Sequence, residues 1–274
     1  MTSNALAGRT LLMSGGSRGI GLAIAVRAAR DGANVAFIAK TDTPDPRLPG
    51  TVHTAAAEIE AAGGQALPIV GDIRDEAAIG DAVAACVDRF GGIDVVVNNA
   101  SAINLSGFGD LTPKRFGLLL DVNVRGMFTL TSAALPHLLK SERASVLTLS
   151  PPLNPDRRWL AEYAPYTLSK FAMTMLTLGI AEQYRDRIAA NCLWPQTLIA
   201  TAAVQNVVAG DEGMRASRRP EIMADAAALV LGGTSTGECY VDADVLRAAG
   251  ISDLSSYAAV AGTPDEDLEL DLFL

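Results

Sequence analysis

The sequence predicts an α/β fold: a doubly wound parallel sheet of about seven strands, flanked by helices. Short apolar runs alternate with longer helical patterns along the chain, and Gly-rich turns separate several of them. The chain has 274 residues, of which 49% are hydrophobic, enough for a sizeable core. Only 5% are aromatic, so we expect the core to be mainly aliphatic.

The first strand, turn and helix predict a phosphate site. Residues 10–13 form an apolar run typical of a buried strand, and residues 22–26 have the spacing and Ala content of a helix. Glycines between them permit a sharp turn and close approach of a pyrophosphate, which the helix N-terminus favours. An ordinary tight turn is the alternative, because a Gly-rich motif alone is weak. The expected cofactor-binding residues here are Gly15, Gly16, Ser17, Arg18, Gly19, Ile20 and Gly21.

The same alternation continues to residue 242. Further strands are expected at residues 34–39, 66–70, 94–97, 145–149, 188–194 and 239–242. Helices are expected at residues 52–62, 75–90, 112–139 (as one helix or two), 171–184 and 220–231. Strands alternating with helices imply parallel pairing through right-handed crossovers. No domain boundary interrupts the pattern, so we expect a single domain over residues 1–274, with a core at 6–242 and an acidic C-terminal extension at about 250–274.

Three segments depart from this pattern. Residues 40–50 contain three prolines, and residues 197–219 end in a small basic cluster. Loops that follow strands form the ligand crevice of an open α/β sheet, so both segments are candidates for ligand binding. The alternative is that each is a solvated surface loop. Residues 264–274 alternate acidic and apolar side chains and could be disordered or could dock on a neighbouring subunit.

Composition excludes several classes of function. A net charge of −9 argues against nucleic-acid binding. The three cysteines, Cys86, Cys192 and Cys239, lie far apart in sequence, which indicates a reducing compartment and no disulfide framework. Residues 1–9 lack the apolar region of a signal peptide, and we expect no apolar run to reach the ~18 residues of a membrane span. We therefore expect a cytoplasmic protein without a membrane span. His53 and His137 lie in helical stretches, and no metal site is expected.

Residues at the strand ends favour NADP(H) over NAD(H). Asn99 follows the fourth strand, and Asp72 follows the third, where a carboxylate can accept a hydrogen bond from an adenine amino group. An acidic residue after the second strand would bind a ribose 2′-hydroxyl, but this chain has Lys40 there. Lys40 and Arg18 together suit a 2′-phosphate. The alternative is a pair of solvated surface cations.

Tyr166 and Lys170 are candidate catalytic residues. Four residues apart on a helix, they share one face. An ammonium beside a phenol lowers the phenol pKa from its usual value of about 10, which suits a general acid or base. This spacing is common, and it gains weight here because it follows a dinucleotide-binding pattern.

Taken together, these ordered motifs resemble the short-chain dehydrogenases/reductases over about residues 6–242. The matching positions are residues 14–21, Asp72, residues 98–100, Asn123, Tyr166 and Lys170. The chain is more similar still to the hydroxysteroid-dehydrogenase-like subgroup, whose longer members carry a sterol-carrier domain. Supporting segments are residues 40–44, 99–103, 149–154 and 193–195. The resemblance implies a Rossmann-like domain that binds a nicotinamide cofactor.

The resemblance also implies a role for each matching residue. Tyr166 would exchange a proton with the substrate oxygen. Lys170 would lower the Tyr166 pKa and hold the nicotinamide ribose, and Asn123 would support a water chain that feeds the proton relay. A homo-oligomer, dimer or tetramer, is also implied, and the apolar run at residues 171–176 would suit an interface helix or the core equally well.

Two positions depart from the family pattern. The catalytic serine usually stands just after the fifth strand, but Ser150 lies sixteen residues before Tyr166, and strand register puts Pro151 at the usual position. Proline has no donor for a substrate oxygen, so we keep Ser150 as the candidate serine, carried to the site by the longer loop. Gln196 follows Pro195 where the family usually has Gly, which puts the cover of the nicotinamide ring in doubt.

These observations predict an oxidoreductase that transfers a hydride between NADP(H) and a carbonyl or secondary alcohol. A lipid-like substrate rests on the resemblance alone. One alternative is an NADP(H)-binding regulatory or interaction protein with little turnover, for which the displaced serine is the motive. Another is an epimerase or dehydratase that uses the same Tyr/Lys pair, although such relatives usually carry a separate substrate domain.

Overall fold

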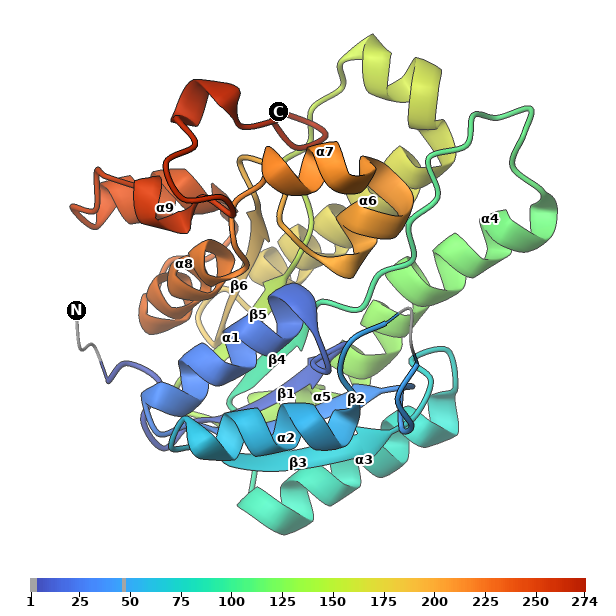
Figure 1. Cartoon of the computed structure of the whole chain (residues 1–274). Coiled ribbons are helices and arrows are strands. Elements are labelled where there is room, and N and C mark those ends of the chain that lie inside the picture. The colour runs from blue at the N-terminus through green and yellow to red at the C-terminus, as the bar shows by residue number, and fades with distance from the viewer. Residues whose placement is uncertain (1–3, 46–47) are drawn as a thin grey trace.

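A single parallel sheet organises the structure, as the sequence predicts. The computed structural model describes residues 4–45 and 48–274. Seven strands pair in the order β3-β2-β1-β4-β5-β6-β7 (Figure 1). They are β1 (Thr10–Ser14), β2 (Asn34–Ala39), β3 (Gln65–Val70), β4 (Val95–Asn98), β5 (Ala144–Thr148), β6 (Ile188–Trp194) and β7 (Cys239–Val241). The order reverses at β1, which lies between β2 and β4.

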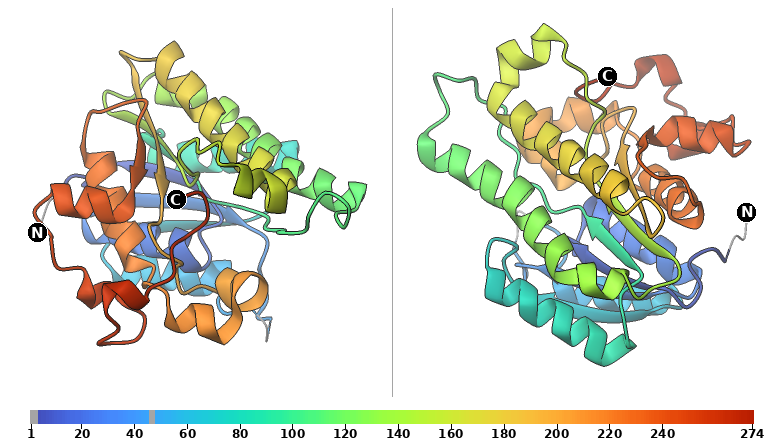
Figure 2. Two further views of the ribbon diagram at one scale, coloured as in Figure 1. Left: turned by 90° about the horizontal axis from the view of Figure 1, so that it is seen from above. Right: turned by 180° about the vertical axis from the view of Figure 1, so that it is seen from behind.

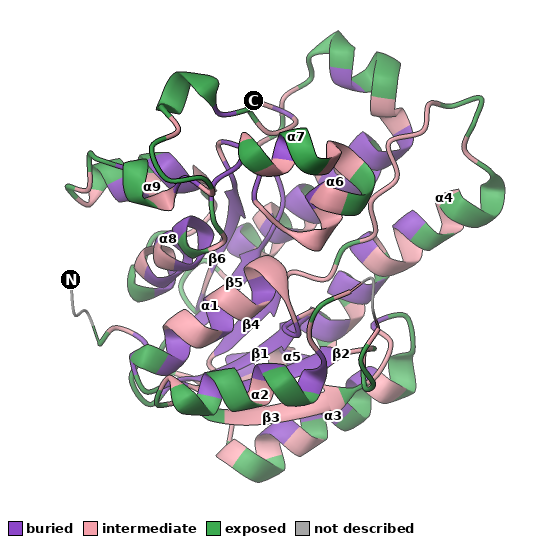
Figure 3. Ribbon diagram, viewed as in Figure 1, coloured by how far each residue is buried: buried purple, intermediate pink, exposed green. Residues whose placement is uncertain are grey.

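Helices cover both faces of the sheet. They are α1 (Gly19–Arg30), α2 (Val52–Ala61), α3 (Glu76–Phe90), α4 (Pro113–Leu119), α5 (Met127–Leu138), α6 (Arg157–Gln183), α7 (Gly210–Arg215), α8 (Glu221–Gly232) and α9 (Asp242–Ala248). Leu11 and Met13 of β1 face the α1, α2 and α8 side, whereas Leu12 faces the α3 and α5 side. This alternation explains why the strands are continuous apolar runs, buried on both faces (Figures 2 and 3).

Local sequence signals fix several helix ends. Thr51 and Thr54 form a reciprocal capping box at the start of α2. Asp75 caps α3, which ends at Gly91 with a left-handed φ of 86°. Thr112 caps α4, with Pro113 in its first turn. These caps lie at or within a few residues of the boundaries expected from sequence.

The segment expected as one or two helices is a continuous helical stretch from Pro113 to Leu138 with a π-helical turn at Leu120–Gly126. By length and composition alone this stretch could cross a membrane, a test that core helices also pass, so the expected absence of a membrane span stays a prediction. In this fold α5 packs on the sheet instead, where Leu130, Ala134 and Leu138 are buried in the core.

Other differences come from contacts between distant residues. Helix α6, which contains the predicted residues 171–183, begins at Arg157, because Asp156 caps it and a kink at Tyr163 accommodates Pro165. Cys192 and Cys239, far apart in sequence, are register partners on β6 and β7. Residues 197–219 form a π-helical turn at Val204–Val208 followed by α7, rather than an extended loop.

Candidate active site

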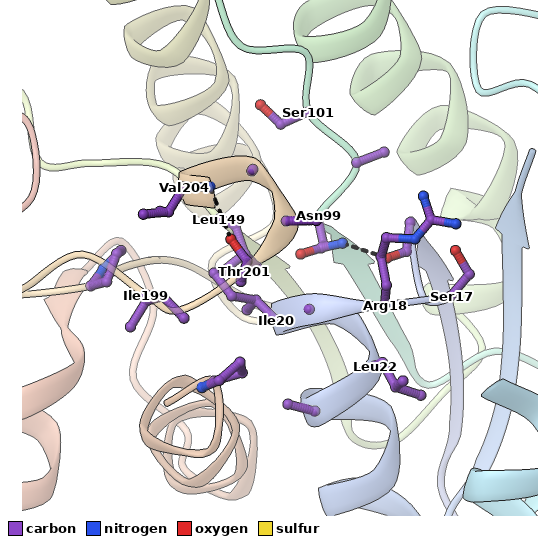
Figure 4. A pocket seen from close by; sticks show the side chains of 18 of the residues that line it. Ser17, Arg18, Ile20, Leu22, Asn99, Ser101, Leu149, Ile199, Thr201 and Val204 are labelled. Carbon is purple, nitrogen blue, oxygen red and sulfur yellow. Dashed lines mark hydrogen bonds between the residues drawn. The ribbon is translucent and has the colours of Figure 1, made fainter. Parts of the chain in front are cut away.

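A cavity of about 1250 Å³ opens at the carboxyl ends of the strands, where the strand order reverses. This is the position at which doubly wound sheets bind ligands. Figure 4 shows Ser17 and Arg18 on one side of the pocket and Ile199, Thr201 and Val204 on the other. Both irregular loops contribute to its lining, through Lys40, Thr41 and Pro49 and through residues 198–204. Within residues 40–50, positions 46 and 47 lie outside the described residues.

Asn99 holds the Gly-rich turn in place. Its side-chain amide donates to the carbonyl oxygens of Ser14, at 3.1 Å, and Gly15, at 2.8 Å. The Ser14 hydroxyl in turn accepts from the backbone N–H groups of Asn99 and Ala100. Gly15 has a φ of 75°, which glycine adopts without strain. The ends of β1 and β4 are thereby locked together beneath the cavity.

The predicted turn residues divide into two groups. Those that line the cavity are Gly15, Ser17, Arg18, Gly19 and Ile20. Gly16 and Gly21 lie behind them, where a Cβ atom would meet Phe37 at 2.8 Å and the Gly15 oxygen at 2.3 Å, respectively. The turn therefore needs glycine for close packing as well as for ligand access.

We expect Gly21→Ala to weaken nucleotide binding more than tenfold and to lower stability by about 1–3 kcal/mol, because the new methyl group overlaps the Gly15 carbonyl. NADPH fluorescence titration and thermal unfolding measure the two effects. Gly80→Ala is the matched control, since a Cβ atom there meets nothing within 4 Å on helix α3. It should bind NADPH normally and be slightly more stable.

The end of the cavity near β2 and β3 is positively charged. Lys40 Nζ lies 3.8 Å from Asp72, but Asp72 is paired more closely with Arg74, at 2.6 Å. The hydrogen bond from Arg74 lowers the pKa of Asp72 to about 2, so the carboxylate is ionised. Arg18 donates to the carbonyl oxygens of Pro49 and Gly50, which keeps its guanidinium beside the turn. Lys40 and Arg18 are thus the cations of this end, and Asp45 is the acidic residue that acts on Arg18.

Tyr166 and Lys170 both reach the cavity from α6, as their spacing predicts. Lys170 is buried, and its ammonium donates to the Leu149 oxygen at 2.7 Å and lies 5.0 Å from the Trp194 ring. Burial lowers the Lys170 pKa to about 8. Burial raises the Tyr166 pKa, and Asp271 adds to the rise. The expected lowering of the phenol pKa is thus outweighed here by desolvation, and Tyr166 is a protonated phenol at neutral pH.

Asn123 sits in the π-helical turn, fully buried. Its amide donates to the Ala102 oxygen and the Ser169 hydroxyl, both at 3.0 Å, and its oxygen accepts from Ala102 N–H at 2.7 Å. The side chain therefore ties the loop after β4 to α6, one residue before Lys170. Its expected part in a water chain stays a prediction.

Ser150 does not join the Tyr166 group, which corrects its assignment as the catalytic serine. It is fully buried and is not among the residues that line the cavity. The Ser150 and Thr174 hydroxyl oxygens lie 2.9 Å apart in a hydrogen bond, and Thr174 donates its proton to the Pro151 oxygen at 2.7 Å, which leaves Ser150 as the donor to Thr174. These two bonds turn the start of the loop against α6 rather than toward the cavity.

Ser101 supplies a hydroxyl that sequence reasoning missed. It lines the cavity after β4, its hydroxyl donates to the Ala102 oxygen at 3.3 Å, and its effect on Tyr166 is to lower the phenol pKa against the larger effects of burial and Asp271. Figure 4 shows it at the opposite side of the pocket from Leu22. Its position directly after Ala100 was the available signal, because that segment was already expected at the switch point.

Residues 268–274, which we name the strap, form the last part of the site. The segment is ordered and folds onto its own chain, which corrects the expectation of disorder, while docking on another subunit stays a prediction. Its end lies beside the first turns of α6 (Figures 1 and 2). Asp271 and Leu272 line the cavity, and Phe273 is fully buried against Tyr166. No pattern in the sequence indicated these contacts.

The cavity fits a dinucleotide. The turn offers a backbone cradle that a Cβ atom would fill, at the start of a helix whose first N–H groups carry no side-chain cap. Cations lie at one end, and the buried Tyr166 and Lys170 lie at the other. In the described part of the chain, no cluster of three or more potential metal ligands is present.

Comparison with known proteins decides the family. A family model described as short chain dehydrogenase matches residues 9–212. The chain belongs to the short-chain dehydrogenase family. This family implies binding of a nicotinamide cofactor and an oxidoreductase activity, consistent with the cavity. The resemblance inferred from the sequence is thereby confirmed.

Two vertebrate proteins that share one name are similar to most of this chain. Hydroxysteroid dehydrogenase-like protein 2 of Danio rerio is 51% identical over 261 residues, covering 94% of this chain and 63% of that protein. The Homo sapiens protein of the same name is 45% identical over 272 residues, covering 98% and 64%. The chain therefore spans somewhat less than two thirds of these relatives.

Solved structures agree with the fold over nearly the whole chain. A short chain dehydrogenase from Mycobacterium thermoresistibile has a TM-score of 0.91 at 52% identity, covering 97% of this chain and 95% of that chain. A dehydrogenase from Xanthomonas campestris has a TM-score of 0.93 at 50% identity, covering 98% of both chains. The similarity extends beyond the residues that the family model matches.

Proposed function

We propose that the protein is an NADP(H)-dependent oxidoreductase that acts on a carbonyl or secondary alcohol. The observation that carries the proposal is that Tyr166 and Lys170 open onto the same cavity as the Gly-rich turn and Lys40. A screen of aldehydes and of straight-chain, cyclic and steroidal ketones tests it, with the consumption of NADPH as the measured signal. Absence of turnover on every compound, with NADPH bound, would contradict it.

Reduction is the direction that the phenol supports. The raised pKa keeps Tyr166 protonated at neutral pH, ready to give its proton to a substrate oxygen. Ser101 lines the same cavity and would polarise that oxygen, in place of a serine after β5. Lys170 would supply positive charge as the proton leaves. When bound, the nicotinamide would supply the hydride.

Apolar side chains of the cavity support a lipid-like substrate. Its lining includes Ile103, Leu118, Val122, Leu149, Trp194, Leu198, Val204, Val208 and Met214, and Ile103 and Trp194 pack in the same cluster as Tyr166. An apolar wall with few polar groups suits an extended hydrocarbon body and fixes orientation through the carbonyl alone. We therefore expect longer-chain ketones and aldehydes to give lower KM values than short ones.

Preference for NADP(H) follows from the charge at the β2 end. We expect Lys40→Ala to weaken NADPH binding about three- to tenfold, because it removes one charge from a 2′-phosphate site that is partly solvated. NADH affinity should stay unchanged. Fluorescence titration of both nucleotides measures this, with Lys114→Ala on α4 as the control cation. Equal affinity of the wild type for NADPH and NADH would refute the preference.

A second candidate is an NADP(H)-binding protein with little turnover. The observation that favours it is the hydrogen bond between Ser150 and Thr174. Because of this bond, Ser150 does not take the position of the catalytic serine in the cavity. Tight NADPH binding combined with negligible reduction in the screen would favour this candidate over the first.

A further inference from the structure

The strap is fixed to the body of the protein by hydrogen bonds from several elements. Leu270 forms an antiparallel bridge with Thr197, and Asp271 N–H donates to the Gln196 oxygen at 3.1 Å. Trp194 Nε1 donates to the Leu272 oxygen at 2.8 Å, and the Asn154 amide donates to the Phe273 oxygen at 2.9 Å. Such complete pairing indicates a built part of the site rather than a passing contact.

Phe273 anchors the strap in a cluster of aromatic rings. Its ring centroid lies 5.4 to 6.2 Å from those of four side chains, Trp159, Tyr166, Phe171 and Trp194. Three of these come from α6, and Trp194 ends β6. The backbone of Phe273 has a left-handed φ of 75°, unusual for a residue with a side chain. The cluster and the flanking hydrogen bonds hold it there.

This anchoring places a carboxyl group where Lys170 needs one. Lys170 is buried, and its ammonium contacts a carbonyl oxygen, a methionine sulfur and the Trp194 ring, none of which carries a negative charge. Asp271 lines the same cavity, two residues before Phe273. Trp194 touches both partners, because its ring lies near Lys170 Nζ and its Nε1 binds the strap. In a poorly solvated site opposite charges interact strongly even when they are not in direct contact.

We propose that Asp271 is a positioning residue of the active site, whose carboxylate keeps Lys170 protonated, and that Phe273 anchors it there. The proposal rests on the proposed function, since it assigns the Lys170 ammonium to a proton step on Tyr166. It gives the strap a role that no family motif covers, because the strap lies outside the matched residues.

The surrounding charges set the direction of the effect. Lys170 is faced by Asp271, with Cys192 of β6 nearby, and both raise its pKa against burial. Asp271 is faced by Lys170, by Asp242 at the start of α9 and by Glu269 of the strap. Burial raises the Asp271 pKa to about 7. Above that pH the ionised carboxylate supports the ammonium, and below it the protonated acid resembles Asn.

Titration of Lys170 tests the proposal without any substrate. The chain has four lysines, so protein carrying [¹³C]lysine gives few ε-carbon NMR signals, and that of Lys170 is assigned by its loss in Lys170→Met. In the wild type this signal should titrate near pH 8. In Asp271→Asn it should titrate at least one unit lower, which leaves about tenfold less ammonium at alkaline pH. Asp267→Asn, an exposed carboxylate before the strap, should leave the titration unchanged.

Each result decides the matter. An unshifted Lys170 titration in folded Asp271→Asn overturns the proposal, while the carbonyl screen independently tests the proposed function. If Asp271→Asn does not fold, Phe273→Leu loosens the anchor instead and should lower the Lys170 titration in the same direction. A red-shifted tryptophan emission in that variant, with Lys170 titrating as in the wild type, would equally overturn it.

Discussion

Tyr166→Phe is expected to reduce NADPH-dependent carbonyl reduction by about 10²- to 10⁴-fold, the range typical for loss of a general acid. The substitution removes one hydroxyl and leaves the ring, so the stacking on Phe273 at 6.2 Å persists. NADPH affinity should remain within about twofold of the wild type, because the phenol lies away from the Gly-rich turn and the β2 end. Steady-state kinetics with the best carbonyl of the screen, together with NADPH titration, separates the two effects.

Two further variants are compared with Tyr166→Phe in this experiment. Tyr184→Phe makes the same change at the end of α6, away from the cavity lining, and should keep full activity. Ser101→Ala removes the second hydroxyl of the cavity lining that would polarise the substrate oxygen, and its kcat should fall between those of the wild type and Tyr166→Phe. If Tyr166→Phe reduces the carbonyl as fast as the wild type, the phenol is not the acid and the assignment fails.

Phe273→Ala is expected to cost about 3–5 kcal/mol of stability, the usual penalty for emptying a large buried aromatic site. Phe273 is fully buried, and four aromatic rings would face the new cavity. Both tryptophans of the chain, Trp159 and Trp194, are among them. Thermal or urea unfolding should therefore show the loss, and tryptophan emission should shift to the red as water reaches the rings.

Leu270→Ala is the matched control for this variant. Leu270 belongs to the same strap, but its side chain is 62% exposed. It should unfold within about 0.5 kcal/mol of the wild type, with unchanged emission. A Phe273→Ala protein as stable as Leu270→Ala would mean that the aromatic cluster contributes little to the fold.

The sheet and the cofactor turn were predictable because local signals carry them. Glycine turns, apolar strands and helix caps lie within a few residues of the elements that they specify, as at Thr51 and Asp75. The Tyr166 and Lys170 pair was predictable for the same reason, since four residues on a helix share a face. Even there, the sequence could not indicate the phenol pKa, which depends on burial under the strap.

The remaining features depend on pairings across the fold. Phe273 meets Tyr166 although more than one hundred residues separate them, and an acidic and apolar segment has no period that predicts such a contact. The orientation of Ser150 depends on Thr174, which lies one helical turn beyond Lys170. The Thr174 hydroxyl forms hydrogen bonds with Ser150 and with the Pro151 oxygen. The adjacency of Cys192 and Cys239 likewise needs the order of β6 and β7.

The position of the strap has a mechanical consequence. Arg158 on the first turn of α6 binds the Leu274 oxygen, and Phe273 is wedged one residue earlier. Any polypeptide attached after Leu274, such as a purification tag, would leave the body next to Tyr166. A force applied to that attachment would act on the aromatic cluster before it acted on the sheet. Tags for kinetic work therefore belong at the amino-terminal end, and a force-sensitive label belongs after Leu274.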